Sequence, residues 1–145
     1  MRRALLVGAC LLLAACGSGA KGLSKEEYAK RADVICTRFT HQTAALGGAS
    51  NLKELAALAS KTLPVLDRAI ADLRKLDPPQ DEQALAHRWL ATLGRLRNDV
   101  VRIRDRSRAN DLAGVGAVVP AAKRDDTESN RLAGQLGTRV CKKPA

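Results

Sequence analysis

Seven arginines between residues 88 and 108 are the side chains whose type and spacing point most directly to chemistry. They are Arg88, Arg95, Arg97, Arg102, Arg104, Arg106 and Arg108. At 100° per residue on a helix, Arg88, Arg95 and Arg102 align along one flank, and Arg97, Arg104 and Arg108 along another. Guanidinium groups bind phosphate and carboxylate, so an anionic lipid headgroup or an acidic envelope polymer is one candidate ligand. The alternative is a solvated helix face whose arginines pair with acids such as Asp99 and Asp105.

The other polar residues do not form a catalytic pattern. His41 and His87 fall on different predicted helices without a second ligand at i+4, which indicates surface histidines rather than metal ligands. The adjacent acids Glu26-Glu27, Asp81-Glu82 and Asp125-Asp126 point about 100° apart on a helix. No nucleophile elbow, phosphate-binding loop or zinc motif is present. We therefore expect no catalytic residue, metal or cofactor, and an enzyme is the less favoured alternative.

The amino terminus has the pattern of an export signal. Arg2 and Arg3 precede an apolar run, Ala4 to Ala15, that ends in small residues. The run has about 12 residues, whereas a helix that spans a bilayer needs about 20. The segment is therefore predicted to be a cleaved signal peptide rather than a transmembrane helix.

The end of this run, Leu13-Ala14-Ala15-Cys16, resembles the lipobox of bacterial lipoproteins. The resemblance implies cleavage before Cys16 and a thioether to lipid at its thiol, with fatty acyl chains such as palmitate as the membrane anchor. An incidental cysteine near an ordinary secretory cleavage site is the alternative. Two or more acyl chains give stable anchoring where one does not. Residues 17–22, rich in glycine and small side chains, are predicted to be a flexible tether.

The remaining two cysteines form a candidate pair. Of the four cysteines, Cys10 and Cys16 belong to the signal peptide and the lipidation site, which leaves Cys36 and Cys141 in the folded part. Outside the cytoplasm an even pair predicts one disulfide. A redox-active or metal-binding pair is the alternative, but the two cysteines lack a Cys-x-x-Cys spacing.

Composition favours one small helical domain outside the cytoplasm. Alanine and leucine dominate the apolar residues, and the aromatic residues are only Tyr28, Phe39 and Trp89. The full chain has a net charge of +10. Cleavage before Cys16 removes Arg2 and Arg3 and no acid, which leaves +8. Nucleic acid is disfavoured as a partner because an exported domain rarely meets it and aromatic stacking residues are scarce.

Hydrophobic periodicity predicts four helices. The first begins at Ser24, with a capping-box spacing to Glu27, and ends at Gly47-Gly48. The second begins at Ser50 or Asn51 and ends at Asp77-Pro78-Pro79, with a kink or a break between Ser60 and Pro64. The apolar stripes are Tyr28, Ala32, Ile35, Phe39 and Leu46 in the first helix, and Leu52, Leu55, Leu58, Leu63, Leu66, Ile70, Leu73 and Leu76 in the second.

The third helix is predicted to be capped by Asp81, and a turn at Asn110-Asp111 leads to the fourth. The core stripes are Leu85, Trp89, Leu93, Leu96, Val100 and Ile103 in the third helix, and Leu112, Val115, Val119, Ala122, Leu132, Leu136 and Val140 in the fourth. Trp89 is expected to pack in the core rather than stack on a ligand. Pro120 makes residues 121–136 the more securely predicted part of the fourth helix, with Gly137 as its C-cap, and leaves open whether the helix is continuous through Pro120. Asp126 and Ser129 fall on the inner stripe. For Asp126 we interpret this as a shift in the phase of the stripe, and the alternative is an inward carboxylate paired with Arg124 or Arg131.

Short connections between four helices predict an up-and-down bundle. Its first helix starts, and its fourth ends, at the same end of the bundle. Cys36 lies three turns into the first helix. Either the chain after Gly137 runs back along the bundle to reach Cys36, or the first helix begins outside the bundle.

The chain resembles a group of small actinobacterial lipoproteins over nearly its whole length. The likeness rests on the lipobox and tether, followed by the motifs Leu23-Ser24-Lys25-Glu26-Glu27-Tyr28, Ala32-Asp33-Val34-Ile35-Cys36, Leu76-Asp77-Pro78-Pro79 and Leu136-Gly137-Thr138-Arg139-Val140-Cys141. It implies the fold and the location and carries over no functional residue.

These observations give an all-α, four-helix up-and-down bundle closed by one disulfide. Residues 1–15 are the predicted signal peptide, 16–22 the lipidated cysteine and tether, and 23–145 the bundle domain. The expected location is the cell membrane, with the domain lipid-anchored and facing away from the cytoplasm. The expected function is a non-enzymatic module that binds an envelope protein partner through a helix face or an interhelical groove. The alternative is the anion-binding module built on the seven arginines.

Overall fold

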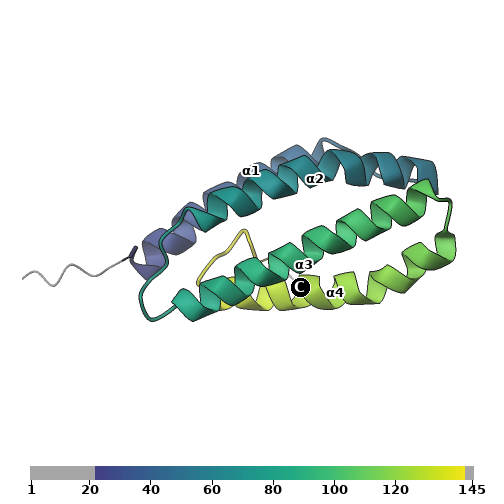
Figure 1. Cartoon of the computed structure of the whole chain (residues 1–145). Helices are drawn as coiled ribbons and strands as arrows, with labels where there is room; N and C mark the ends of the chain where they lie inside the picture. The colour runs from purple at the N-terminus through teal and green to yellow at the C-terminus, as the bar shows by residue number, and fades with distance from the viewer. Residues whose placement is uncertain (1–21, 143–145) are drawn as a thin grey trace, which may run out of the picture.

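The computed structural model describes residues 22–142, and the described chain is an α-helical bundle. Its helices are α1 (Lys25–Ala44), α2 (Leu52–Arg74), α3 (Gln83–Arg108) and α4 (Leu112–Gln135). Figure 1 shows them running alternately up and down one elongated bundle. The predicted fold class is confirmed. The signal peptide, Cys16 and residues 17–21 of the tether lie outside the described residues.

Side-chain caps begin three of the helices. Ser24 Oγ accepts from Glu27 N at 3.2 Å, Asn51 Oδ1 from Glu54 N at 2.9 Å, and Asp111 Oδ1 from Gly114 N at 2.7 Å. The predicted cap of the third helix, Asp81, is wrong: α3 follows Glu82, whose backbone N–H donates to the Pro79 carbonyl in a turn. In a capping box the Glu27 carboxylate would accept from the backbone N–H of Ser24. It accepts instead from Arg31 Nε at 2.7 Å.

Two helices continue through a proline. Pro64 lies inside α2, which rules out a break there, the second of the two alternatives. Pro120 lies inside α4, so the fourth helix is continuous through it, a point that the sequence left open. Each proline removes one backbone donor. Buried neighbours compensate, because Leu63 and Leu66 flank Pro64 in the core and Val118 is buried two residues before Pro120.

The core lies between the halves of the helices nearest the start of α1. It contains Tyr28, Ala32 and Ile35 of α1, Leu73 of α2, Ala86 and Trp89 of α3, Leu132 and Ala133 of α4, and Leu136. Trp89 is 1% exposed, as predicted for a core residue. Its indole N–H donates to Ser129 Oγ at 3.2 Å. Ser129 therefore faces the core, in agreement with its place on the inner stripe of the sequence pattern.

The first turns of α4 do depart from the predicted stripe. Val118 is buried, whereas Val119 is half exposed and Leu112 is 70% exposed. Val115 is buried as predicted, so the departure from the predicted stripe in these turns is at Leu112 and Val119. Val140, also assigned to the stripe, lies beyond the helix and is 43% exposed. Small residues explain the error, because the alanines and glycines of this segment leave the helical phase weakly marked in the sequence.

The chain after α4 runs back along the bundle, which settles how Cys141 reaches Cys36. Gly137 has a positive φ of 83° and turns the chain at the end of α4, as predicted for a C-cap. Figure 1 shows the segment after this turn leaving the end of α4 and folding back toward the middle of the bundle. Cys36 and Cys141 form the predicted disulfide, with 5.2 Å between their Cα atoms.

The returning tail, residues 138–142, is also held by one carboxylate of α1. Asp33 accepts from the backbone N–H groups of Arg139 at 2.9 Å, Val140 at 2.8 Å and Cys141 at 3.1 Å. These contacts satisfy three backbone donors that no helix or strand pairs. Asp33 therefore fixes the tail in the position from which Cys141 meets Cys36.

Replacement of Asp33 by alanine is expected to loosen the tail and to lower the free energy of unfolding by about 1–2 kcal/mol, because it removes charge-assisted hydrogen bonds at a partly exposed site. Urea unfolding under oxidising conditions measures the loss, and hydrogen exchange locates it at the amides of residues 139–141. Asp33→Asn keeps one acceptor oxygen and should lose less. Unchanged exchange at these amides would contradict the assignment.

Candidate functional site: an apolar interhelical groove and the arginines of α3

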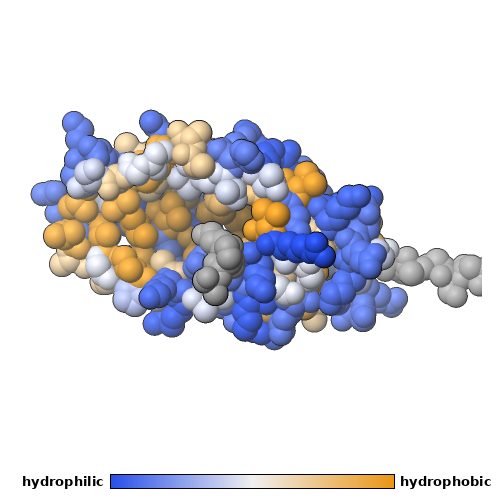
Figure 2. Space-filling view, turned by 180° about the vertical axis from the view of Figure 1, so that it is seen from behind, coloured by the Kyte–Doolittle hydropathy of each residue, from blue (hydrophilic) through white to orange (hydrophobic). Residues whose placement is uncertain are grey.

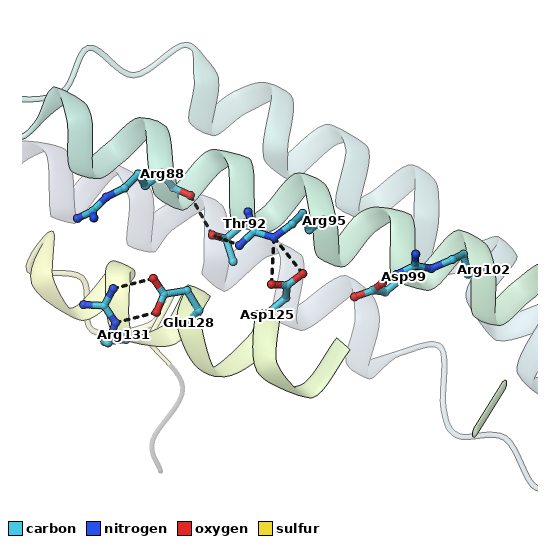
Figure 3. Close-up of polar contacts among 8 residues, drawn as sticks. All are labelled: Arg88, Thr92, Arg95, Asp99, Arg102, Asp125, Glu128 and Arg131. Atoms are coloured by element: carbon cyan, nitrogen blue, oxygen red, sulfur yellow. Dashed lines mark hydrogen bonds and ion pairs between the residues drawn. The ribbon is translucent and has the colours of Figure 1, made fainter. Parts of the chain in front are cut away.

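The first arginine flank of α3 is directed toward α4. Figure 3 shows Arg88, Arg95 and Arg102 in a row along α3, next to Asp125 and Glu128 of α4. Arg95 Nε lies 3.0 Å from Asp125 Oδ1, which joins the two helices. Arg102 pairs with Asp99 on its own helix.

Arg88, the remaining member of this flank, is exposed, and its positive charge acts on Glu128 of α4. A hydrogen bond from Arg131 is the main cause that lowers the pKa of Glu128, and the positive charges of Arg131, Arg88 and Arg95 add to it. Figure 3 shows Glu128 facing Arg131 along α4, with Arg88 on the facing helix. Arg88 therefore lies in the field of an acid that another arginine already binds.

The second flank meets α2 and the end of the bundle. Arg97 Nε is 2.8 Å from Asp67 Oδ1 of α2, and Arg108 Nη2 donates to Ser60 Oγ at 3.0 Å. Arg104 pairs with Asp105 at 2.8 Å, and Arg106 with Asp111 at 3.0 Å. The structure does not bring the seven arginines to one surface, and five of them bind carboxylates. Anion binding by the whole set remains a prediction.

Lowering the pH is expected to destabilise the bundle through these carboxylates. A hydrogen bond from Arg97 holds the pKa of Asp67 below its usual value, and one from Lys75 does the same for Asp72. A carboxyl group whose pKa is lowered in the folded state stabilises the fold above its unfolded pKa, about 4, and loses that contribution as the pH falls through the folded value.

The urea midpoint should therefore stay constant from about pH 7 to about pH 5 and fall below about pH 4. Asp67→Asn should remove part of this fall, because asparagine does not titrate. A midpoint that rises on acidification would contradict the assignment.

The structure also shows where the two histidines lie and how long and how apolar the described helices are. His41 on α1 and His87 on α3 are both exposed, on separate helices. Within residues 22–142 no cluster of three or more histidine, cysteine or acidic side chains could hold a metal ion. None of the helices described here is both long enough and apolar enough to cross a bilayer.

An apolar groove opens between α1 and α4. In the bundle, α3 packs against both α2 and α4, and α1 packs against α2. The first half of α1 shares the core with the end of α4, but their backbones make few close contacts. The space has a volume of about 220 Å³. Its walls include Phe39 of α1, Leu66 and Ile70 of α2, and Leu93, Leu96 and Val100 of α3. Figure 2 shows hydrophobic residues gathered over one half of the face seen from behind, where the surface is hollowed.

The polar side chains of this α1–α4 groove are largely engaged with one another. Asn130 Nδ2 donates to Asp126 Oδ2 at 3.3 Å within α4, and Ser129 accepts from Trp89. Thr62 donates to the Leu58 carbonyl of its own helix at 2.9 Å. The groove therefore offers an apolar surface with few polar groups directed toward a ligand. Asp126, whose inner position we interpreted as a phase error, lines this groove instead.

Sequence periodicity identified the groove residues but not the groove. Phe39, Leu93, Leu96 and Val100 all belong to the predicted core stripes, and the structure leaves them only partly buried. The signal that could have located the opening is weak: the apolar pattern of the first helix fades after Phe39. The side chains point inward as predicted, but no neighbouring helix covers them.

Comparison of the chain with known proteins gives no match. No protein-family model matches the chain, and neither a curated protein nor a solved structure matches it. Fold and site define its class on their own: a four-helix up-and-down bundle, closed by one disulfide and with an apolar groove between α1 and α4.

Proposed function

We propose that this protein is a lipid-anchored lipoprotein of the cell envelope, and that it binds an amphipathic helix of a protein partner in the α1–α4 groove without enzymatic activity. The observation that carries the binding role is the groove itself, because a closed bundle would bury Phe39, Leu96 and Val100 completely. A partly covered apolar face of this kind is typical of an interaction site.

The size of the groove favours apolar side chains as its occupant. Its volume of about 220 Å³ lies below the range of about 300–1,000 Å³ usual for small-molecule sites. From Trp89 to Val100 it follows α3 for about 17 Å, which corresponds to three helical turns. A helix that presents apolar residues at i, i+3 or i+4 and i+7 matches this length.

Charge favours an acidic partner. Starting at Cys16, the chain carries a net charge of +8. A partner helix whose polar face is acidic would be attracted to the domain over a distance of about 8–10 Å at physiological salt. We therefore commit to an amphipathic helix with an apolar face in the groove and acidic residues beside it.

The lipid anchor rests on the lipobox at residues 13–16. The first described residues, which follow the tether, show where the chain enters the bundle. Leu23 N donates to the Asp77 carbonyl at 2.9 Å, so the first described residues are bound to the α2–α3 connection. At Gly22, with a φ of 105°, a Cβ would lie 2.4 Å from the Pro78 carbonyl oxygen. The chain thus enters the bundle at the end where α1 begins, and the groove lies along its side.

The anchor is tested by mass spectrometry of the exported protein. We expect a mature chain that begins at Cys16 and carries the mass of a diacylglycerol and any further acyl chain, and a Cys16→Ser variant that leaves the membrane fraction. An unmodified thiol at Cys16 in the exported protein would refute the anchor and would leave the groove proposal untouched.

The groove is tested by photocrosslinking of the full-length chain in cells. A photoreactive phenylalanine analogue replaces Phe39 in the groove or, as the control, Val34, which is 64% exposed on the same helix. We expect an adduct from position 39 only. Ala69→Phe, which fills the groove, should abolish the adduct, and Ala71→Phe on the exposed side of α2 should not.

Sequencing of the crosslinked segment decides the occupant. Apolar residues at helical spacing with acidic residues beside them support the proposal. A phospholipid adduct, an adduct that survives Ala69→Phe, or equal adducts from both positions would overturn it. Folding of each variant is checked by the fluorescence of Trp89, the only tryptophan, which lines the groove.

A further inference from the structure

A second cavity lies between the first turns of α2 and the last turn of α3. This cleft has a volume of about 460 Å³, and Lys53, Ser60, Ser107, Arg108 and Asn110 supply its polar side chains. Within the described part of the chain, two cations line it and no carboxylate does. It is separate from the α1–α4 groove and shares no lining residue with it.

Arg108 differs from the paired arginines of α3. Its guanidinium donates to the neutral hydroxyl of Ser60, which in turn donates to the Ala56 carbonyl at 2.6 Å. One of its five N–H donors is used in this contact, and a hydroxyl does not neutralise its charge. The neighbouring acid, Asp105, binds Arg104 directly at 2.8 Å. Asp105 also lies in the field of Arg108: the hydrogen bond from Arg104 is the main cause that lowers its pKa, and the charge of Arg108 adds to it. No carboxylate, however, is within ion-pair distance of Arg108 in the described residues.

Lys53 adds a second positive charge from the first turn of α2. The acid next to it, Glu54, is occupied by the helix start, since its carboxylate accepts from Ser50 N at 2.8 Å and from Asn51 Nδ2 at 2.9 Å. The amino-terminal end of α2 carries the positive end of the helix dipole. Lys53, the dipole and Arg108 thus combine into one positive region around the cleft.

Ser107 provides an independent sign of a missing ligand. The residue is 3% exposed, and its hydroxyl oxygen is buried with no hydrogen-bond partner among residues 22–142. Most buried hydroxyls in folded proteins have a partner. At this position on the wall of a positive cleft, an oxyanion is the partner that the surroundings favour.

We propose that this cleft is a binding site for a phosphate group. Lys53 and Arg108 supply charge and hydrogen bonds, and Ser60, Ser107 and Asn110 complete the set of polar groups around the ligand. Arginine and lysine side chains are the usual phosphate ligands of proteins, and hydroxyl and amide groups fix the orientation of the anion. Of the seven arginines that the sequence analysis named as possible anion ligands, only Arg108 lines this cleft. The second cation, Lys53 of α2, was not among the residues named from the sequence.

The position of the cleft bears on the source of the phosphate. It lies at the start of α2, and α2 spans 23 residues or about 34 Å, so it is at the opposite end of the bundle from the start of α1. If the chain is anchored at Cys16, as proposed above, an upright bundle presents the cleft away from its own membrane. A soluble or polymer-borne phosphate is then favoured over a lipid headgroup, although the site itself does not depend on the anchor.

The test uses the full-length chain in detergent, titrated with inorganic phosphate and followed by calorimetry. We expect saturable binding that Lys53→Gln/Arg108→Gln weakens about tenfold or more. The control Lys61→Gln/Arg68→Gln removes the same charge from exposed positions of α2 and should change affinity by less than about twofold. Ser107→Ala should weaken phosphate binding and raise the urea midpoint measured without phosphate, a combination that a purely structural serine would not give.

A second arm distinguishes the source of the anion. Flotation uses the Cys16→Ser chain, which has no acyl anchor of its own. Flotation with phosphatidylglycerol vesicles but not with phosphatidylcholine vesicles assigns the site to a lipid headgroup if the added Lys53→Gln/Arg108→Gln changes abolish it and the control changes do not. Absence of binding to both inorganic phosphate and phosphatidylglycerol overturns the proposal. So does binding that Lys53→Gln/Arg108→Gln and the charge-matched control reduce equally, because it would reflect net charge alone.

Discussion

Replacement of both Cys36 and Cys141 by serine is expected to lower the free energy of unfolding by about 4–5 kcal/mol, the largest effect of any change considered for this protein. The disulfide joins residues 105 positions apart, so it restricts nearly the whole folded chain in the unfolded state. In the folded state it attaches the tail to α1, where Cys36, Val140 and Cys141 line the α1–α4 groove. Loss of the disulfide should therefore weaken both the fold and the wall of the groove.

Urea unfolding with and without reductant measures this effect. The wild-type midpoint should fall on reduction, and the doubly substituted variant should unfold at the same urea concentration in both conditions. Asp33 continues to bind the tail in the variant, so residues 139–141 should retain part of their protection from hydrogen exchange. Two freely alkylated thiols in the exported wild-type protein, or a difference below about 1 kcal/mol, would contradict the prediction.

The features that the sequence predicted correctly depend on neighbours along the chain or on simple counting. Ser24 caps α1 and Gly137 ends α4 because each acts on backbone groups within a few residues. The disulfide followed from the fact that Cys36 and Cys141 are the only cysteines beyond the predicted lipidation site. The number and order of the helices followed from periodicity and short connections.

The features that the sequence did not predict depend on which element lies opposite. Periodicity places Phe39 and Leu96 on inward faces, but it does not reveal that α1 and α4 remain apart and leave these side chains partly open. The sequence pattern places Ser129 on an inner stripe, but it does not show that Trp89, on another helix, supplies its hydrogen-bond donor. The cleft between α2 and α3 that we propose to bind phosphate was missed for the same reason, since Lys53 and Arg108 are 55 positions apart in the sequence.

Asp99 is the clearest case of a polar residue whose environment the sequence did not disclose, and it leads to the second large prediction. It was expected on the solvated side of α3, but it is 1% exposed and pairs with Arg102. Its second carboxylate oxygen has no hydrogen-bond partner within residues 22–142. Removal of Arg102 would leave the buried charge without a counter-ion, which is far more costly than replacing both members of a pair.

Arg102→Ala is therefore expected to lower the free energy of unfolding by about 2–3 kcal/mol, below the 3–5 kcal/mol of a fully buried pair because the Arg102 side chain is 58% exposed to water. Adding Asp99→Asn to this variant should restore most of the loss, because asparagine keeps the shape and removes the uncompensated charge. Arg131→Ala is the matched control: Arg131 forms an i,i+3 pair of the same spacing with Glu128, and both side chains are exposed (49% and 39%), so a loss below about 0.5 kcal/mol is expected. Recovery by Asp99→Asn separates a charge effect from lost packing of the arginine stem. If the double variant is as unstable as Arg102→Ala alone, packing and not the buried carboxylate accounts for the role of Arg102.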